Sequence, residues 1–113
     1  MARIAVSPEV APGKVVEAAR VLGFNIRTAR KRRRLRQVEL ARRAGITVQT
    51  LRRVESGSLG TGIGAYLAAL WAMGLESDIG ALASPDTDVE GKTLEAAKRN
   101  KRVRPEKRLD NDF

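Results

Sequence analysis

Hydrophobic residues recur at helical spacing over the first three quarters of the chain. Between Lys14 and Arg33 they occupy positions 15, 19, 22, 26 and 29, so each follows the previous one by three or four residues. That spacing places them on one face of an amphipathic helix, although Gly23 interrupts the helix at some cost in stability. Residues 1–13 show no such period and hold two prolines and a glycine. They are predicted to form a flexible N-terminal arm.

Two shorter helices are predicted over residues 37–44 and 48–56, joined by a tight turn. Gly45 provides the left-handed residue that ends the first helix, and Thr47 is placed to accept a hydrogen bond as the N-cap of the second. Leu35 and Ile46 should anchor the flanking turns to the core. The positions expected to face inward on the two helices are Leu40, Ala41, Ala44, Leu51 and Val54.

The remaining part of the predicted domain contains a fourth helix over residues 63–73, which is apolar on most sides. A further short helical turn is expected over residues 75–83, with Ile79 and Leu82 pointing inward. The fourth helix carries Tyr66 and Trp71, which we expect in the core or in a dimer contact.

After residue 83 the composition changes. Residues 84–113 carry eight basic and seven acidic side chains and few large apolar ones. Such a segment buries too little apolar surface to order itself alone. The predicted organisation is therefore an arm (1–13), an all-α domain (14–83) and a mobile charged tail (84–113), with a short helix around residues 92–101.

Composition excludes several classes of function. The chain has no cysteine and no histidine, which excludes disulfides, thiolate or imidazole metal sites and the usual pairs of nucleophile and base. No pair of carboxylates shows catalytic spacing. No apolar run reaches the ~20 residues that a membrane span needs. We therefore expect a cytoplasmic protein that is not an enzyme, has no cofactor and has no membrane partner.

The net charge of +9 is concentrated in one segment. Residues 22–57 contain eleven basic and two acidic side chains, which account for the whole net charge of the chain. A focused positive potential favours a polyanionic partner such as nucleic acid. A solvated basic surface is the alternative, as is a nuclear localisation signal within residues 30–34.

The segment Gln37–Gly57 combines the requirements of a helix-turn-helix. Ala41 is small enough for the two helices to approach closely, Gly45 allows the turn, and Ile46 fixes the turn to the core. Gln49, Arg52 and Arg53 should then lie on the outer face of the second helix, where they could enter the DNA major groove. The alternative is an ordinary helical hairpin within a bundle.

From Leu22 to Leu82 the sequence resembles the Xre/Cro-type helix-turn-helix of bacterial and phage repressors. The resemblance rests on LGFNIRTARKRRRLRQVELARRAGITVQTLRRVESG and on IGAYLAALWAMGLESDIGAL. It implies a five-helix, lambda-repressor-like bundle that binds double-stranded DNA at palindromic operators as a homodimer.

The same resemblance assigns roles to single residues. It places Val48, Gln49, Arg52 and Arg53 at the base-reading positions of the recognition helix. Gln49 can pair with adenine, an arginine with guanine, and Val48 can pack on a thymine methyl group. The residues expected to contact phosphate are Arg33, Arg36, Gln37 and Thr50. Arg30 and Glu55 match a pair that forms an internal salt bridge in the family.

Two positions depart from the family pattern. Arg36 stands where Thr or Ser often caps the second helix, so a capping box with Glu39 would be half lost. Arg34 stands where a glycine is common, so the first helix is expected to end differently.

The C-terminal sequence EKRLDNDF is similar to the tails of HipB-like antitoxins, which repress their own operon and neutralise a HipA-type kinase toxin. Leu109 and Phe113 would be the partner-binding anchors of this tail. The alternatives are a stand-alone repressor, a protein that mainly neutralises a toxin, and a tail that only adds solubility or contacts phosphate nonspecifically.

Overall fold

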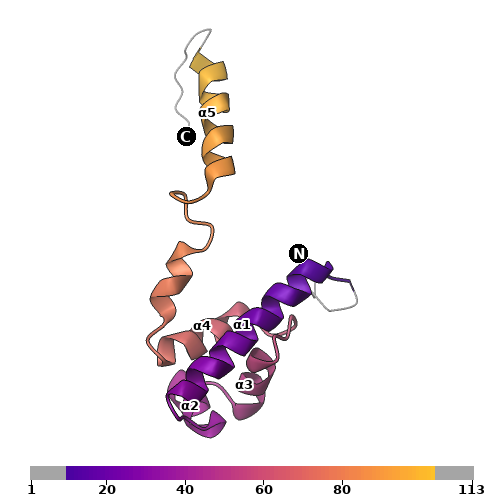
Figure 1. Cartoon of the computed structure of the whole chain (residues 1–113), viewed down its shortest axis with the longest axis vertical. Helices are drawn as coiled ribbons and strands as arrows, with labels where there is room; N and C mark the ends of the chain where they lie inside the picture. The colour runs from indigo at the N-terminus through magenta and orange to yellow at the C-terminus, as the bar shows by residue number, and fades with distance from the viewer. Residues whose placement is uncertain (1–9, 104–113) are drawn as a thin grey trace. The chain divides into compact units, whose positions relative to one another are not determined.

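The computed structural model describes residues 10–103, most of which lie in helices, with no strand among them. The prediction of an all-α fold is confirmed. The chain divides into two compact units, one ending at Ile79 and the other beginning at Gly80. The helices, labelled in Figure 1, are α1 (Gly13–Arg32), α2 (Gln37–Ala44), α3 (Val48–Glu55), α4 (Ile63–Ala72), the 3₁₀ helix η1 (Glu76–Ala81) and α5 (Val89–Val103).

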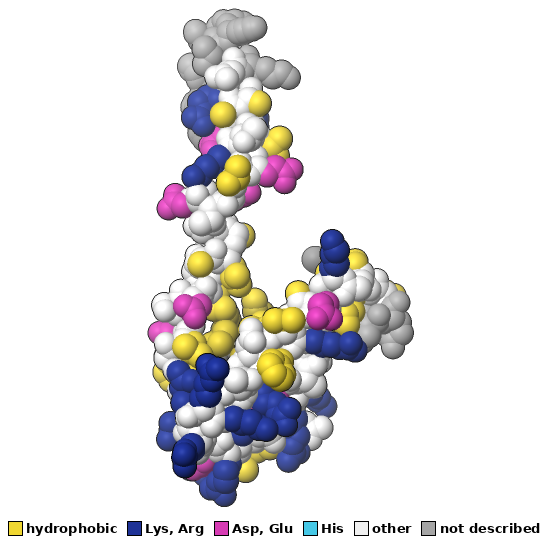
Figure 2. Space-filling model, viewed as in Figure 1, with side chains coloured by type: hydrophobic (Ala, Val, Ile, Leu, Met, Phe, Trp, Pro, Cys, Tyr) yellow, Lys and Arg dark blue, Asp and Glu magenta, His cyan; other side chains and the backbone are white. Residues whose placement is uncertain are grey.

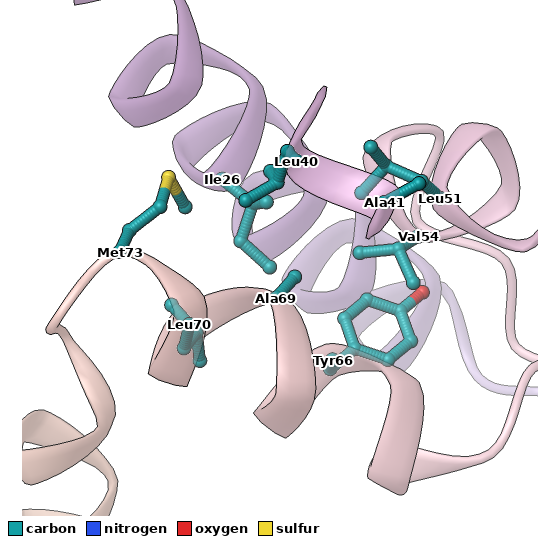
Figure 3. Packing of buried hydrophobic residues seen from close by; sticks show 9 residues of the cluster. All are labelled: Ile26, Leu40, Ala41, Leu51, Val54, Tyr66, Ala69, Leu70 and Met73. Atoms are coloured by element: carbon teal, nitrogen blue, oxygen red, sulfur yellow. The ribbon is translucent and has the colours of Figure 1, made fainter. Parts of the chain in front are cut away.

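The core of the first unit lies between α1, α2, α3 and α4. Helix α3 packs against all three of the others, and α2 also packs against α4. Figure 3 shows the buried side chains converging from these helices. They are Ile26, Leu40, Ala41, Leu51, Val54, Tyr66, Ala69, Leu70 and Met73. The inward positions predicted for α2 and α3 supply four of these residues, so the hydrophobic pattern located the centre of the domain.

Gly23 has a structural role that the sequence pattern concealed. An added Cβ atom there would lie 2.5 Å from the backbone oxygen of Val54 and 2.7 Å from the backbone nitrogen of Gly57. Helix α1 therefore crosses the end of α3 at a distance that only glycine permits. The close packing of α1 against the end of α3 offsets the helix stability that a glycine within α1 is expected to cost.

The ends of the short helices are fixed by local geometry. Gly45 has φ 74°, and the Thr47 hydroxyl accepts a hydrogen bond from the Thr50 N–H at 3.0 Å, so both predicted signals are confirmed. Arg34 has φ 54°. The chain after α1 therefore turns through the left-handed region even though the residue is not glycine, and the expectation of a different ending is wrong.

Two predicted inward positions are exposed. Val15 lies in the first turns of α1, and Leu82 lies just after η1 with 69% of its surface exposed. Of the two aromatic residues on α4, Tyr66 belongs to the core, whereas Trp71 is exposed, so for Trp71 the dimer contact stays a prediction. At Val15 the hydrophobic period continues beyond the region where another helix of the unit covers it, and Leu82 lies beyond the end of the first unit at Ile79. Ile79, in contrast, packs against the core as predicted.

The second unit consists of η1's last residues, a turn and α5. The helix is longer than the one predicted around residues 92–101, and Asp88 accepts a hydrogen bond from the Gly91 N–H at 2.9 Å at its start. Val89 and Leu94 are exposed. Within the described part of the chain, no helix has the length and apolarity needed to cross a membrane.

Candidate nucleic-acid interface

Helix α3 presents a polar row on its outer face. Leu51 and Val54 are fully buried and hold the helix against the core, whereas Gln49, Arg52 and Arg53 are exposed. Within residues 10–103, no side-chain hydrogen bond or ion pair engages these three side chains. An amide and two guanidinium groups are therefore available to an external partner.

The other two candidate contacts on α3 are less accessible. Val48 is half-buried and packs against the core, so only part of its side chain could meet a base. Thr50 is half-buried, and its hydroxyl oxygen accepts a hydrogen bond from the Thr47 hydroxyl at 2.9 Å. The Thr50 O–H remains able to donate to a phosphate oxygen.

Arg30 and Glu55 form the ion pair that the family resemblance implied. The Arg30 Nε atom lies 2.7 Å from Glu55 Oε2, and a second hydrogen bond of 3.1 Å joins Arg30 to Glu55 Oε1. Both residues are only 8% exposed. The third Arg30 nitrogen donates to the Leu35 carbonyl at 2.8 Å. The pair thus joins the last turn of α1 to the end of α3, and each buried charge has its partner.

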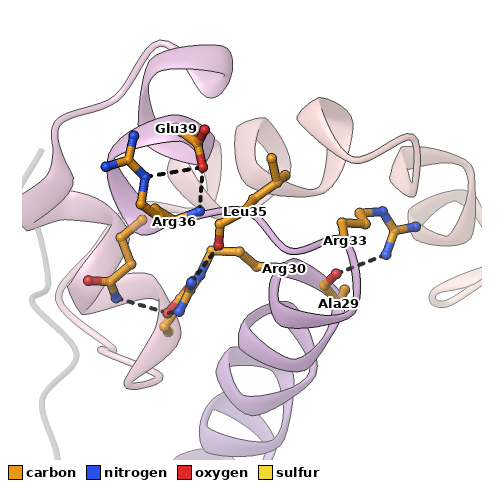
Figure 4. Close-up of polar contacts among 8 residues, drawn as sticks. Ala29, Arg30, Arg33, Leu35, Arg36 and Glu39 are labelled. Atoms are coloured by element: carbon orange, nitrogen blue, oxygen red, sulfur yellow. Dashed lines mark hydrogen bonds and ion pairs between the residues drawn. The ribbon is translucent and has the colours of Figure 1, made fainter.

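Gln37 also belongs to this network, which the sequence did not reveal. Its side-chain amide donates to Glu55 Oε1 at 3.0 Å, and Figure 4 shows the neighbouring bond from Arg30 to the Leu35 carbonyl. The first residue of α2 is thereby fixed to the last residue of α3. Gln37 was expected to contact phosphate through its side chain or its backbone N–H, and one side-chain donor is now committed to Glu55. The backbone N–H at the start of α2 is still free for that contact.

The start of α2 is held by Glu39, which accepts a hydrogen bond from the Arg36 N–H at 2.7 Å. This bond, followed by the charge of the Arg36 guanidinium, lowers the pKa of Glu39. A guanidinium cannot accept a hydrogen bond, so the reciprocal half of the capping box is missing, as predicted. The Arg36 side chain is exposed and contacts Glu39 at 3.5 Å. Arg33 is exposed as well, and its guanidinium donates to the Ala29 carbonyl at 3.0 Å.

Most basic side chains of this unit have no acidic neighbour. Among the side chains that the structure describes in residues 10–79, only Arg30 and Arg36 form ion pairs. The others around the end of α1, on α2 and on α3 form no ion pair; they are Arg27, Lys31, Arg32, Arg33, Arg34, Arg42, Arg43, Arg52 and Arg53. Figure 2 shows Lys and Arg side chains gathered over this part of the molecule. The surface suits a polyanion.

A shallow hollow of about 530 Å³ lies between α3 and the start of α4. Thr50 and Arg53 line it from α3, and the residues following α3 are small, which leaves the space open. The lining residues on that side are Ser58, Gly60, Thr61, Gly62, Gly64 and Ala65.

Among residues 10–103, no group of three or more acidic side chains is placed to hold a metal ion. Leu109 and Phe113, the expected anchors of the tail, lie outside the residues that the structure describes.

Comparison with known proteins identifies the fold of the first unit. A family model described as a helix-turn-helix domain matches residues 12–78, which is more than half of the chain. No curated protein matches the sequence. The matched residues include all of α1–α4 and the exposed row on α3. Domains of this kind bind DNA by placing the second helix of the motif in the major groove. The chain belongs to the helix-turn-helix domain family.

Proposed function

We propose that the protein is a sequence-specific transcriptional repressor of the Xre/Cro type that binds a palindromic operator as a homodimer. The observation that carries the proposal is the row Gln49, Arg52 and Arg53, which is exposed on a helix fixed at both ends. Thr47 caps the start of α3, and Arg30 with Gln37 holds its end. A rigid row of this kind can form bidentate hydrogen bonds with adenine and guanine edges.

The surrounding groups supply contacts to the DNA backbone. The free N–H groups at the start of α2 can bind an anion such as phosphate, because the helix dipole is positive there. Arg33, Arg36 and the Thr50 hydroxyl supply further hydrogen-bond donors. Phosphate contacts orient the domain on DNA but do not distinguish one base sequence from another. The α3 row would contact the bases and so distinguish sequences. Repression follows when the bound protein covers a promoter.

Two matched variants test the assignment. DNA enriched by the protein from a random pool serves as the specific probe, and the starting pool serves as the nonspecific one. Gln49→Ala should weaken binding to the enriched DNA by about 1–3 kcal/mol and leave nonspecific binding unchanged. Arg33→Ala should weaken both to a similar extent and reduce the slope of affinity against salt concentration. Equal loss on both probes for Gln49→Ala would contradict base reading by α3.

A second function, that of a HipB-like antitoxin, is supported by the separate C-terminal unit. The described residues from Gly80 to Val103 belong to a compact unit of their own, and the sequence EKRLDNDF follows them. A segment that does not build the DNA-binding core is free to bind a HipA-type kinase toxin, with Leu109 and Phe113 as anchors. Co-purification with the product of a neighbouring kinase gene tests this role. Deletion of residues 84–113 should abolish co-purification and preserve affinity for the enriched DNA, whereas loss of DNA affinity would assign the tail to DNA.

A further inference from the structure

Helix α4 has a solvent-facing side without any charge. Its ten residues, IGAYLAALWA, contain no charged side chain, in a chain of which 31% is charged. Tyr66, Ala69 and Leu70 point into the core. At helical spacing, the opposite side is formed by Ile63, Gly64, Leu67, Ala68 and Trp71. Ala72 lies at the edge of this side, where it is half-buried and also packs against the core. Ile63 is 71% exposed and Trp71 is 60% exposed, so large apolar groups lie in water there.

We propose that this side of α4 is the surface on which two copies of the chain associate, with their α4 helices antiparallel. The proposal rests on the homodimer of the proposed function and names its interface. In a contact with two-fold symmetry, a pair of residues occurs twice. If one residue of the first copy touches another residue of the second copy, the same two residues also touch with the copies interchanged. When the symmetry axis passes between Leu67 and Ala68, Trp71 of each copy lies opposite Gly64 of the other. Leu67 then lies opposite Ala68, and Ile63 lies opposite Ala72.

Each large side chain therefore faces a small one. A Cβ atom added at Gly64 would meet nothing within 4 Å, so the space above this glycine is open within one copy. Close packing of large against small groups is what a stable interface requires.

The competing apolar surface on the same unit is less suitable. Val21 and Phe24 are exposed on the outer side of α1, but Arg20, Arg27 and Lys31 lie around them on the same helix. Burial of that surface would remove these charges from water without partners, which is costly. It would also bring together like charges of two strongly basic chains. The α4 side avoids both penalties.

Trp71 is the only tryptophan of the chain, so its fluorescence reports directly on the proposed contact. The full chain is diluted over a wide concentration range, and its mass is followed by sedimentation equilibrium. A dimer is expected, with Trp71 emission moving to shorter wavelength as the dimer forms. A chain that stays monomeric, or a dimer in which the emission does not move, overturns the proposal.

Charged variants test the antiparallel register. Gly64→Lys and Trp71→Glu alone should each raise the dimer dissociation constant at least about tenfold. A mixture of the two should form heterodimers, because the introduced lysine of one copy would face the introduced glutamate of the other. Phe24→Glu is the matched control on α1 and should leave dimerisation unchanged. Circular dichroism checks that each variant folds, and both variant sites are exposed in the single copy.

The outcomes separate the interface from the DNA-binding function. If Trp71→Glu dimerises normally and Phe24→Glu does not, α4 is not the interface. Nonspecific binding of Trp71→Glu to the unenriched pool should persist, because α3 and the basic surface are unchanged. Loss of nonspecific binding in a folded variant would instead contradict the proposed DNA interface.

Discussion

Gly23 of α1 and Gly57, which follows α3, meet through their backbones. A Cβ atom on Gly23 would lie 2.7 Å from the Gly57 nitrogen, and one on Gly57 would lie 2.6 Å from the Ala19 carbonyl oxygen. Gly57 also has φ 76°. Each glycine therefore permits the other segment to approach, and together they set the distance between α1 and the candidate recognition helix.

Replacement of Gly23 by alanine should destabilise the domain by about 3 kcal/mol. The added methyl group meets backbone atoms, which cannot move aside as a flexible side chain can, and this cost outweighs the higher helix propensity of alanine. Chemical denaturation measures the loss. Gly60→Ala is the matched control, since its nearest atom would be the Ser58 hydroxyl at 3.9 Å. Equal stability of both variants would refute the close contact.

Arg34→Gly should stabilise the domain by about 1 kcal/mol. A residue with a Cβ atom is strained at φ 54°, and glycine is not. Arg34→Ala removes the same charge but keeps the strain, so it should bring no comparable gain. Thermal unfolding of the three proteins at the same salt concentration distinguishes strain from charge. A gain of the same size in both variants would attribute the effect to charge repulsion.

Substitutions in the hydrogen-bond network around Glu55 should lower the free energy of unfolding by different amounts. Glu55→Gln leaves the buried Arg30 without a counter-charge and should cost about 3–5 kcal/mol. Gln37→Ala removes one hydrogen bond and should cost about 1 kcal/mol. In the double variant the two losses should not add, because both act on the same carboxylate. Additive losses would show that the contact between Gln37 and Glu55 contributes nothing.

Glu39 should make stability depend on acidic pH. Its pKa is lowered in the folded protein, so the ionised carboxylate favours folding above the unfolded pKa of about 4.5. That contribution is lost as the pH falls through the folded pKa. Glu39→Gln should therefore lower the melting temperature slightly at neutral pH, and the difference from the wild type should vanish at pH values below the folded pKa. A difference that persists there would contradict this assignment.

The sequence predicted the features that depend on local signals. Thr47, Gly45 and the inward positions of α2 and α3 act within their own helices or turns, and a single segment is enough to recognise them. The Arg30–Glu55 pair joins residues that are distant in the chain, and it was expected only through the family resemblance.

Features that depend on the packing of distant segments could not be predicted in this way. The need for glycine at position 23 arises from the backbone of Val54 and Gly57, which the pattern of α1 does not contain. Gln37 likewise finds its partner at the far end of α3. At Val15 the hydrophobic period is maintained, but no other helix of the unit covers it, so periodicity alone assigned it to the core.

The length of α3 limits how much sequence one copy can distinguish. Its eight residues span about 12 Å, and the exposed row occupies less than two turns of this helix. With successive base pairs about 3.4 Å apart, one such helix covers about three to four base pairs. Sites of that length recur by chance throughout any genome, so the proposed homodimer, with two α3 helices at a fixed separation, would distinguish a longer DNA sequence than one copy can.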